Sequence, residues 1–155
     1  MHLRQVLAPI SAACAVLVTA TPARTASPPP AAADSLVEVI PDRIEGSRGL
    51  LRCLAFAAPS GFPSRIGRAL ARSEASVASS RPRCTFRDLP PGPIAISVVH
   101  DADVSGDITT NALGIPVEGY GFSRDARGTF GPPDFEDAAF THDGRARTLK
   151  VRLSY

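Results

Sequence analysis

The chain has 155 residues, of which 17 are Lys or Arg and 15 are Asp or Glu. If an export signal occupies residues 1–26, the mature chain keeps 129 residues and loses Arg4 and Arg24, which leaves 15 basic and 15 acidic residues. A neutral chain of that length fits one domain and lacks the basic excess that nucleic-acid binding needs.

The first 26 residues have the pattern of a signal peptide. His2 and Arg4 give a positive start, and Val6–Ala20 is a mostly apolar run. Small residues follow at three candidate cleavage positions, Ala20, Ala23 and Ala26. The run is shorter than the roughly 20 residues that span a bilayer. We therefore expect a periplasmic or secreted protein with no transmembrane span in the mature chain. A lipid anchor at Cys14 is the less favoured alternative, because Ser11 stands where a leucine-like residue is wanted.

A Pro- and Ala-rich linker follows at residues 27–34, and residues 35–155 form the single folded domain. Apolar residues alternate with polar ones between Pro and Gly turns, which predicts half-buried strands. The predicted strands are Leu36–Ile40, Leu50–Ala57, Arg83–Arg87, Ile94–Val99 and Leu149–Leu153. Ile66 and Leu70, one helical turn apart, predict at most one short helix, within Ser64–Ala75. The pattern as a whole predicts an all-β, antiparallel β-sandwich of immunoglobulin-like or prealbumin-like type.

Two cysteines remain once Cys14 has left with the signal. Cys53 and Cys84 each lie in an alternating apolar segment, and an exported protein meets an oxidising environment, so we expect them to form a disulfide. Closing that loop would stabilise the fold by roughly 3–4 kcal/mol in the chain-entropy model. The alternative is a pair of buried free thiols.

The most informative segment is His100–Phe122. Asp101, Asp103, Ser105 and Asp107 alternate around Gly106, which is the arrangement of oxygen ligands and turning glycine in a calcium loop. A helical calcium loop would end in a glutamate where this chain has Ala112, so Glu118 or Asn111 would have to complete the ligand set. Asp and Gly clusters also form plain turns without metal. The calcium site and the plain turn both stay open.

Two further features raise the question of a ligand surface. His100 could act as a general base beside Asp101 or Asp103, but the chain has no nucleophile motif, and a structural histidine is favoured; His142 is interpreted in the same way. Aromatic residues are dense from residue 120 onward, namely Tyr120, Phe122, Phe130, Phe135 and Phe140. Exposed, they would bind a carbohydrate or peptide; buried, which is favoured, they fill one end of the sandwich.

The run HDADVSGDITTNALGIPVEGYGFSRDARGTFGPPDFEDAAF, preceded by LPPGPIAISVV, resembles the bacterial domain-of-unknown-function family 2141. The shared elements fall in order over Leu89–Phe140, and Leu36–Pro63 fits the opening hairpin of the family. The resemblance implies a small exported β-sandwich of unassigned activity and supplies no catalytic residue. The loop also resembles the calcium loops of surface-protein sandwich repeats.

These observations favour a non-catalytic binding or accessory module of the cell envelope, with an envelope protein or a small ligand as partner. A purely structural envelope component is one alternative. A hydrolase-like enzyme that uses His100 and nearby acids is another. The possible ligand surface comprises His100, Tyr120, Phe122 and Phe130.

Overall fold

The computed structural model describes residues 35–106 and 118–155. The predicted signal and linker lie outside these residues, as do Asp107 and Asn111 of the predicted loop. None of the helices in the described part of the chain is long and apolar enough to cross a membrane.

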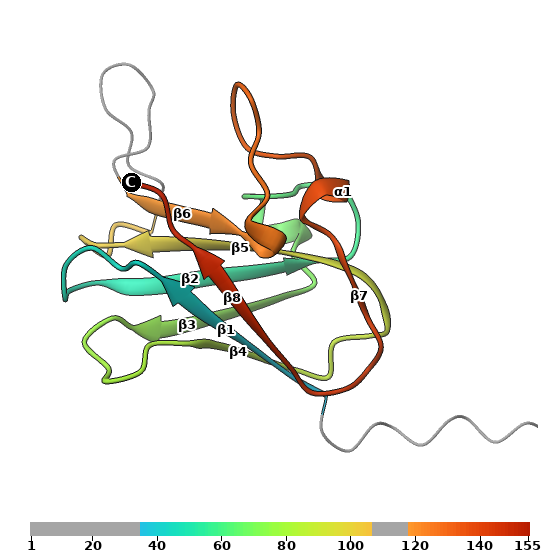
Figure 1. Ribbon diagram of the computed structural model, residues 1–155, viewed down its shortest axis with the longest axis horizontal. Coiled ribbons are helices and arrows are strands. Elements are labelled where there is room, and N and C mark those ends of the chain that lie inside the picture. The colour runs from blue at the N-terminus through green and yellow to red at the C-terminus, as the bar shows by residue number, and fades with distance from the viewer. Residues whose placement is uncertain (1–34, 107–117) are drawn as a thin grey trace, which may run out of the picture.

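The described residues form eight strands. Figure 1 shows how they are arranged. They are β1 (Leu36–Asp42), β2 (Leu50–Phe56), β3 (Ala71–Ser76), β4 (Cys84–Arg87), β5 (Gly92–Asp101), β6 (Gly119–Phe122), β7 (Phe140–His142) and β8 (Arg147–Arg152). The helical segments are short: η1 (Ile66–Arg68), η2 (Ser123–Asp125) and α1 (Phe135–Ala138). One sheet has the order β4-β1-β8, and the other has the order β3-β2-β5-β6, with β7 also paired to β5. The predicted all-β fold is confirmed.

One strand pair departs from the antiparallel expectation. β1 and β8 run parallel, with Val37 opposite Arg147 and Asp42 opposite Arg152, whereas all the other strand pairs of the described chain are antiparallel. The two sheets meet at one side through a bridge between Tyr120 and Ser154. The first and last strands of the domain therefore lie side by side in the smaller sheet (Figure 1).

Side-chain alternation places the main core between the sheets. In β2, Leu51, Cys53 and Ala55 point inward and are fully buried, while Arg52 and Leu54 point outward. The same rule places His100 of β5 on the inner face and Asp101 on the outer face. Val37 and Val39 of β1 and Val151 of β8 complete the inner layer. The predicted strands at these positions are therefore confirmed by burial as well as by pairing.

A disulfide joins the two sheets. Cys53 of β2 and Cys84 of β4 are bonded, and both residues are buried in the core. The strands β2 and β4 belong to different sheets. The predicted Cys53–Cys84 pairing is confirmed, and the bond connects the two layers of the sandwich.

The predicted helix within Ser64–Ala75 is wrong over most of its length. The structure has the short η1 turn followed by β3, which pairs with β2 in register from Ala71 to Ser76. The two residues that suggested a helix are exposed, Ile66 by 57% and Leu70 by 44%, so they do not form a buried helical stripe. Half-buried residues instead alternate with exposed ones along β3, which is strand behaviour.

A second apolar cluster covers part of the outer face of the larger sheet. It contains Phe56, Ala95, Phe122, Phe135 and Ala138, with Phe62 packed against them. The ring of Phe62 lies within 6 Å of three other rings, those of Phe56, Phe122 and Phe135, in edge or tilted contacts. The expected burial is confirmed for Phe122 and Phe135 in this cluster and for Phe140 in the main core. The elements η2 and α1 both contact β5.

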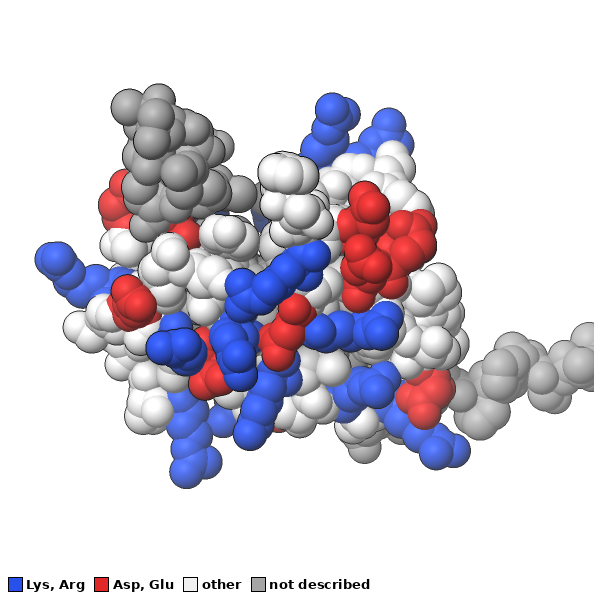
Figure 2. All heavy atoms as spheres, turned by 45° about the horizontal axis from the view of Figure 1, so that its top comes forward, with Lys and Arg blue, Asp and Glu red and all other residues white. Residues whose placement is uncertain are grey.

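Charged side chains of both signs lie next to one another on the surface. Figure 2 shows basic side chains over much of the face turned to the viewer, with smaller acidic groups among them. Among the ion pairs of the described residues, Arg83 lies 2.8 Å from Glu38 and Arg52 lies 3.2 Å from Glu74. Opposite charges that are separated along the sequence are thus brought into contact by strand pairing.

His142 should prove replaceable by leucine. The ring is 1% exposed, and among the described residues neither of its nitrogens has a hydrogen-bond partner. Because a buried polar group without a partner is costly, His142→Leu should raise the free energy of unfolding by about 1 kcal/mol, as measured by urea denaturation at neutral pH. The matched control is His100→Leu, which should lower it, because both ring nitrogens of His100 have partners. Equal losses in the two variants would contradict this account.

Candidate functional site

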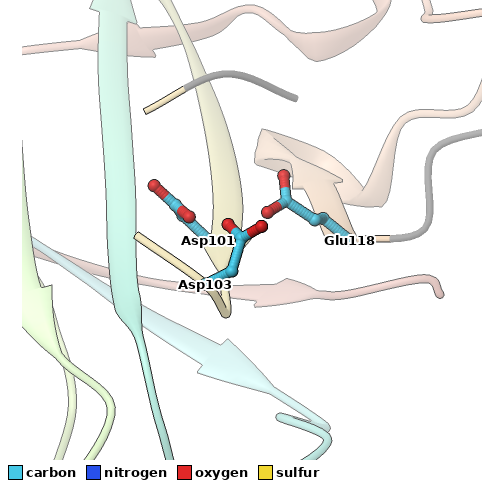
Figure 3. Close-up of side chains that lie close together, drawn as sticks. All are labelled: Asp101, Asp103 and Glu118. Carbon is cyan, nitrogen blue, oxygen red and sulfur yellow. The ribbon is translucent and has the colours of Figure 1, made fainter. Parts of the chain in front are cut away.

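The acidic loop begins where β5 ends and closes where β6 begins. Figure 3 shows the side chains of Asp101, Asp103 and Glu118 close together at this end of the larger sheet, with the carboxylates of Asp103 and Glu118 turned toward each other. Asp101 is the last residue of β5, and Glu118 directly precedes β6. Strand register brings them together, because His100 of β5 pairs with Gly119 of β6.

Asp101 is the fixed member of the cluster. It is 1% exposed, and one carboxylate oxygen lies 2.6 Å from Nε of Arg52. The carboxylate also accepts hydrogen bonds from the backbone N–H groups of Ser105 and Gly106, each at 3.0 Å. Arg52 in turn pairs with Glu74 across the β2–β3 ladder. Asp101 therefore organises the loop backbone as well as contributing negative charge.

Asp103 and Ser105 form the exposed side of the loop. The Asp103 carboxylate accepts the Ser105 N–H at 3.0 Å. Hydrogen bonds from Ser105, first from its side chain and then from its backbone, lower the pKa of the Asp103 carboxyl. Asp103 is therefore ionised at neutral pH, as a calcium ligand must be.

The three carboxylates form a compact group of oxygen ligands. One oxygen each from Asp101, Asp103 and Glu118 can be chosen so that all lie within 4.8 Å of one another. Of the three carboxylates, that of Asp101 is paired with the guanidinium of Arg52. Carboxylate oxygens held this close are the ligands that a hard divalent cation takes. The predicted members Asp101, Asp103 and Glu118 are thus brought together, Ser105 bonds to the two aspartates, and Asp107 lies outside the described residues.

Gly49 lies directly beneath the loop. Its φ of +92° is in the left-handed region, and a Cβ there would overlap the carbonyl oxygen of Asp101 and lie 2.6 Å from the Cα of Ala102. The backbone that carries Asp101 therefore rests against a position where only glycine fits. Sequence reasoning missed both Gly49 and Arg52, because each lies about fifty residues from the loop and reaches it through strand pairing.

His100 is separated from the acidic cluster. It points to the inner face, where Nε2 lies 2.8 Å from the carbonyl oxygen of Arg48 and Nδ1 lies 2.8 Å from the hydroxyl of Tyr155. A carbonyl oxygen only accepts, so Nε2 carries the proton, and Nδ1 of a neutral ring accepts from Tyr155. The Tyr155 hydroxyl accepts the Glu45 N–H, and burial raises the pKa of Tyr155. Both ring nitrogens of His100 are thus hydrogen-bonded within the fold, as the structural role favoured from the sequence implies. The ring does not face Asp101.

The aromatic ligand surface predicted from the sequence is not continuous. Phe122 is buried and Tyr120 is half-buried, both at the second apolar cluster. Phe130, for which burial was favoured from the sequence, is instead fully exposed, at 102%. Together with the buried His100, these residues occupy three different environments, so they do not form one binding face.

Fold and site together define a small, disulfide-bonded β-sandwich with an acidic loop at one end of its larger sheet. The sequence from residue 39 to residue 150 matches the family DUF2141, described as uncharacterized proteins conserved in bacteria. The chain belongs to this family, and the resemblance noted in the sequence is confirmed. No curated protein and no solved structure showed a significant match to the chain.

Proposed function

We propose that this protein is an exported, non-catalytic binding or accessory module of the bacterial cell envelope, with a loop stabilised by calcium. The observation that carries the proposal is the compact group of carboxylates formed by Asp101, Asp103 and Glu118, of which Asp101 is paired with the guanidinium of Arg52. A divalent cation would take oxygen ligands from all three carboxylates. The disulfide supports export, because such bonds persist in oxidising compartments.

Calcium would act here as a structural ion. The loop connects β5 of the larger sheet to β6, and Asp101 already fixes the first part of it through Ser105 and Gly106. A cation held by all three carboxylates would tie the β6 side to the β5 side through Glu118. The loop would then present a fixed surface to a partner in the calcium-rich exterior, where extracellular modules bind calcium with dissociation constants of about 10⁻⁴–10⁻³ M.

The test is a thermal melt of the chelator-stripped protein with and without millimolar calcium, combined with calorimetric titration. We expect calcium to raise the Tm of the native protein by about 5 °C. Asp103→Asn should have the same Tm as the native protein in the absence of calcium, because Asp103 is exposed and its hydrogen bond with Ser105 lies within the loop. The variant should lose most of the increase in Tm that calcium produces.

Two controls accompany this variant. Glu136→Gln removes one exposed acid from α1, away from the loop, and should keep the full calcium effect. Asp101→Ala should lower the Tm both with and without calcium, because it removes the buried one of the two acidic partners of Arg52 and two hydrogen bonds from backbone N–H groups. A native protein that gives neither binding heat nor a shift in Tm would show that the aspartates only form a turn.

A further inference from the structure

A groove of about 440 Å³ opens on the outer face of the larger sheet, beside the acidic loop. Its volume is within the range of small-molecule sites. Outward-facing side chains of Leu54 and Val99 contribute to its lining, together with Pro63 and Ile66 at one flank and Asp101 at the other. The second apolar cluster covers the neighbouring part of the same face. The groove is therefore the part of this apolar face that the elements in residues 35–106 and 118–155 leave open.

Both flanks of the groove are held by hydrogen bonds. On one side, the Ser97 hydroxyl donates to the carbonyl oxygen of Pro63 at 2.7 Å, and the Leu70 N–H donates to the carbonyl oxygen of Ala55 at 2.8 Å. On the other side, Gly106 donates to the buried Asp101. A ligand would thus enter a site whose shape is fixed beforehand, which lowers the ordering cost of binding.

The two arginines that line the groove differ in whether they already have an acidic partner. Arg52 lies between Asp101 at 2.6 Å and Glu74 at 3.2 Å, so its charge is already offset. Arg72 also lines the groove, in the row of β3, β2 and β5 residues that includes Leu54. Within the described chain, no side-chain hydrogen bond or ion pair involves Arg72. The groove therefore combines an apolar floor with one guanidinium that has no anionic partner there.

The geometry points to a binding site for a small, free, monoanionic amphiphile, namely an alkyl carboxylate. Its apolar chain would lie on Leu54 and Val99 and cover Ile66, which is otherwise 57% exposed. Its carboxylate would take two parallel hydrogen bonds from the planar guanidinium of Arg72. This inference rests on the proposed role as a binding module and deepens it, but it does not need the calcium ion.

The test is calorimetric titration of the protein with alkyl carboxylates from hexanoate to laurate, each below its micelle concentration, and with the alcohol of the same chain length. We expect saturable binding of the carboxylates, stronger for longer chains, and binding of the alcohols weaker by about tenfold. Arg72→Gln should weaken carboxylate binding by about tenfold and leave alcohol binding unchanged. Ile66→Asp, at an exposed position that tolerates substitution, should weaken binding of both.

The matched control is Arg87→Gln, which removes an exposed arginine from β4 in the other sheet and should bind as the native protein does. Absence of saturable carboxylate binding would overturn the inference. So would equal affinity for carboxylate and alcohol, or equal affinity of the native and Arg72→Gln proteins for the carboxylate. The titrations are run in chelator and again in calcium, so a failure of the calcium proposal appears as a missing calcium effect, separately from a failure at the groove.

Discussion

Replacing Cys53 and Cys84 together by alanine should lower the free energy of unfolding by about 3–4 kcal/mol. The bond closes a loop with a sequence separation of 31 residues and connects β2 to β4, which lie in different sheets. Removing the bond raises the conformational entropy of the unfolded chain. It also removes the covalent connection between the two sheets. Urea denaturation of the native and double-variant proteins measures the difference.

Two controls test whether the loss of stability comes from the disulfide itself. Reducing the native protein should produce a loss of similar size, and its oxidised form should have a mass two protons below the dithiol. Cys14→Ala should leave the mature protein unchanged, since Cys14 belongs to the predicted signal. A double variant as stable as the native protein would show that the bond adds no stability to the sandwich.

Gly49→Ala should be the most damaging single methyl addition at the acidic loop, lowering the free energy of unfolding by about 3 kcal/mol. The new Cβ would overlap the Asp101 carbonyl oxygen and meet Ala102, at a residue whose φ is +92°. Relief requires the start of the loop to move, which displaces Asp101 from Asp103 and Glu118. Urea denaturation and calcium titration of the same variant measure both consequences.

The chain offers a matched control for this substitution. Gly46 has nearly the same φ, +89°, but nothing lies within 4 Å of a Cβ built there. Gly46→Ala therefore adds backbone strain without the overlap and should cost about 1 kcal/mol with calcium binding unchanged. If Gly49→Ala and Gly46→Ala cost the same, the close approach to Asp101 has no energetic importance.

The local sequence pattern was sufficient to predict a strand where one face of that strand is buried. Leu149 and Val151 alternate with polar residues in β8, and Glu38 separates the buried Val37 and Val39 in β1. The helix around Ile66 was mispredicted because a single pair at helical spacing does not establish a buried stripe, and the alternation of Ala71, Ser73 and Ala75 involves only small residues. The parallel pairing of β1 with β8 joins the two ends of the domain, and no local signal specifies it.

The candidate site divides in the same way. The spacing of Asp101 and Asp103 identified the loop, because acidic residues two positions apart can be recognised in the sequence alone. Arg52 was not predicted as the partner of Asp101, since the contact depends on the register between β2 and β5. The less favoured alternative, His100 acting beside Asp101, does not fit the structure for a simpler reason: β5 extends through Asp101, so the two residues alternate to opposite faces.

The parallel β1–β8 pair has a consequence for a protein under tension. Because the strands run in the same direction, the residue that enters β1 and the residue that leaves β8 lie at opposite ends of the ladder from Val37–Arg147 to Asp42–Arg152. Force applied through these two ends would slide one strand along the other and load the ladder bonds together, whereas an antiparallel pair pulled from one end opens bond by bond. The parallel hydrogen bonds between β1 and β8 would therefore resist stretching of the domain between its first and last strands.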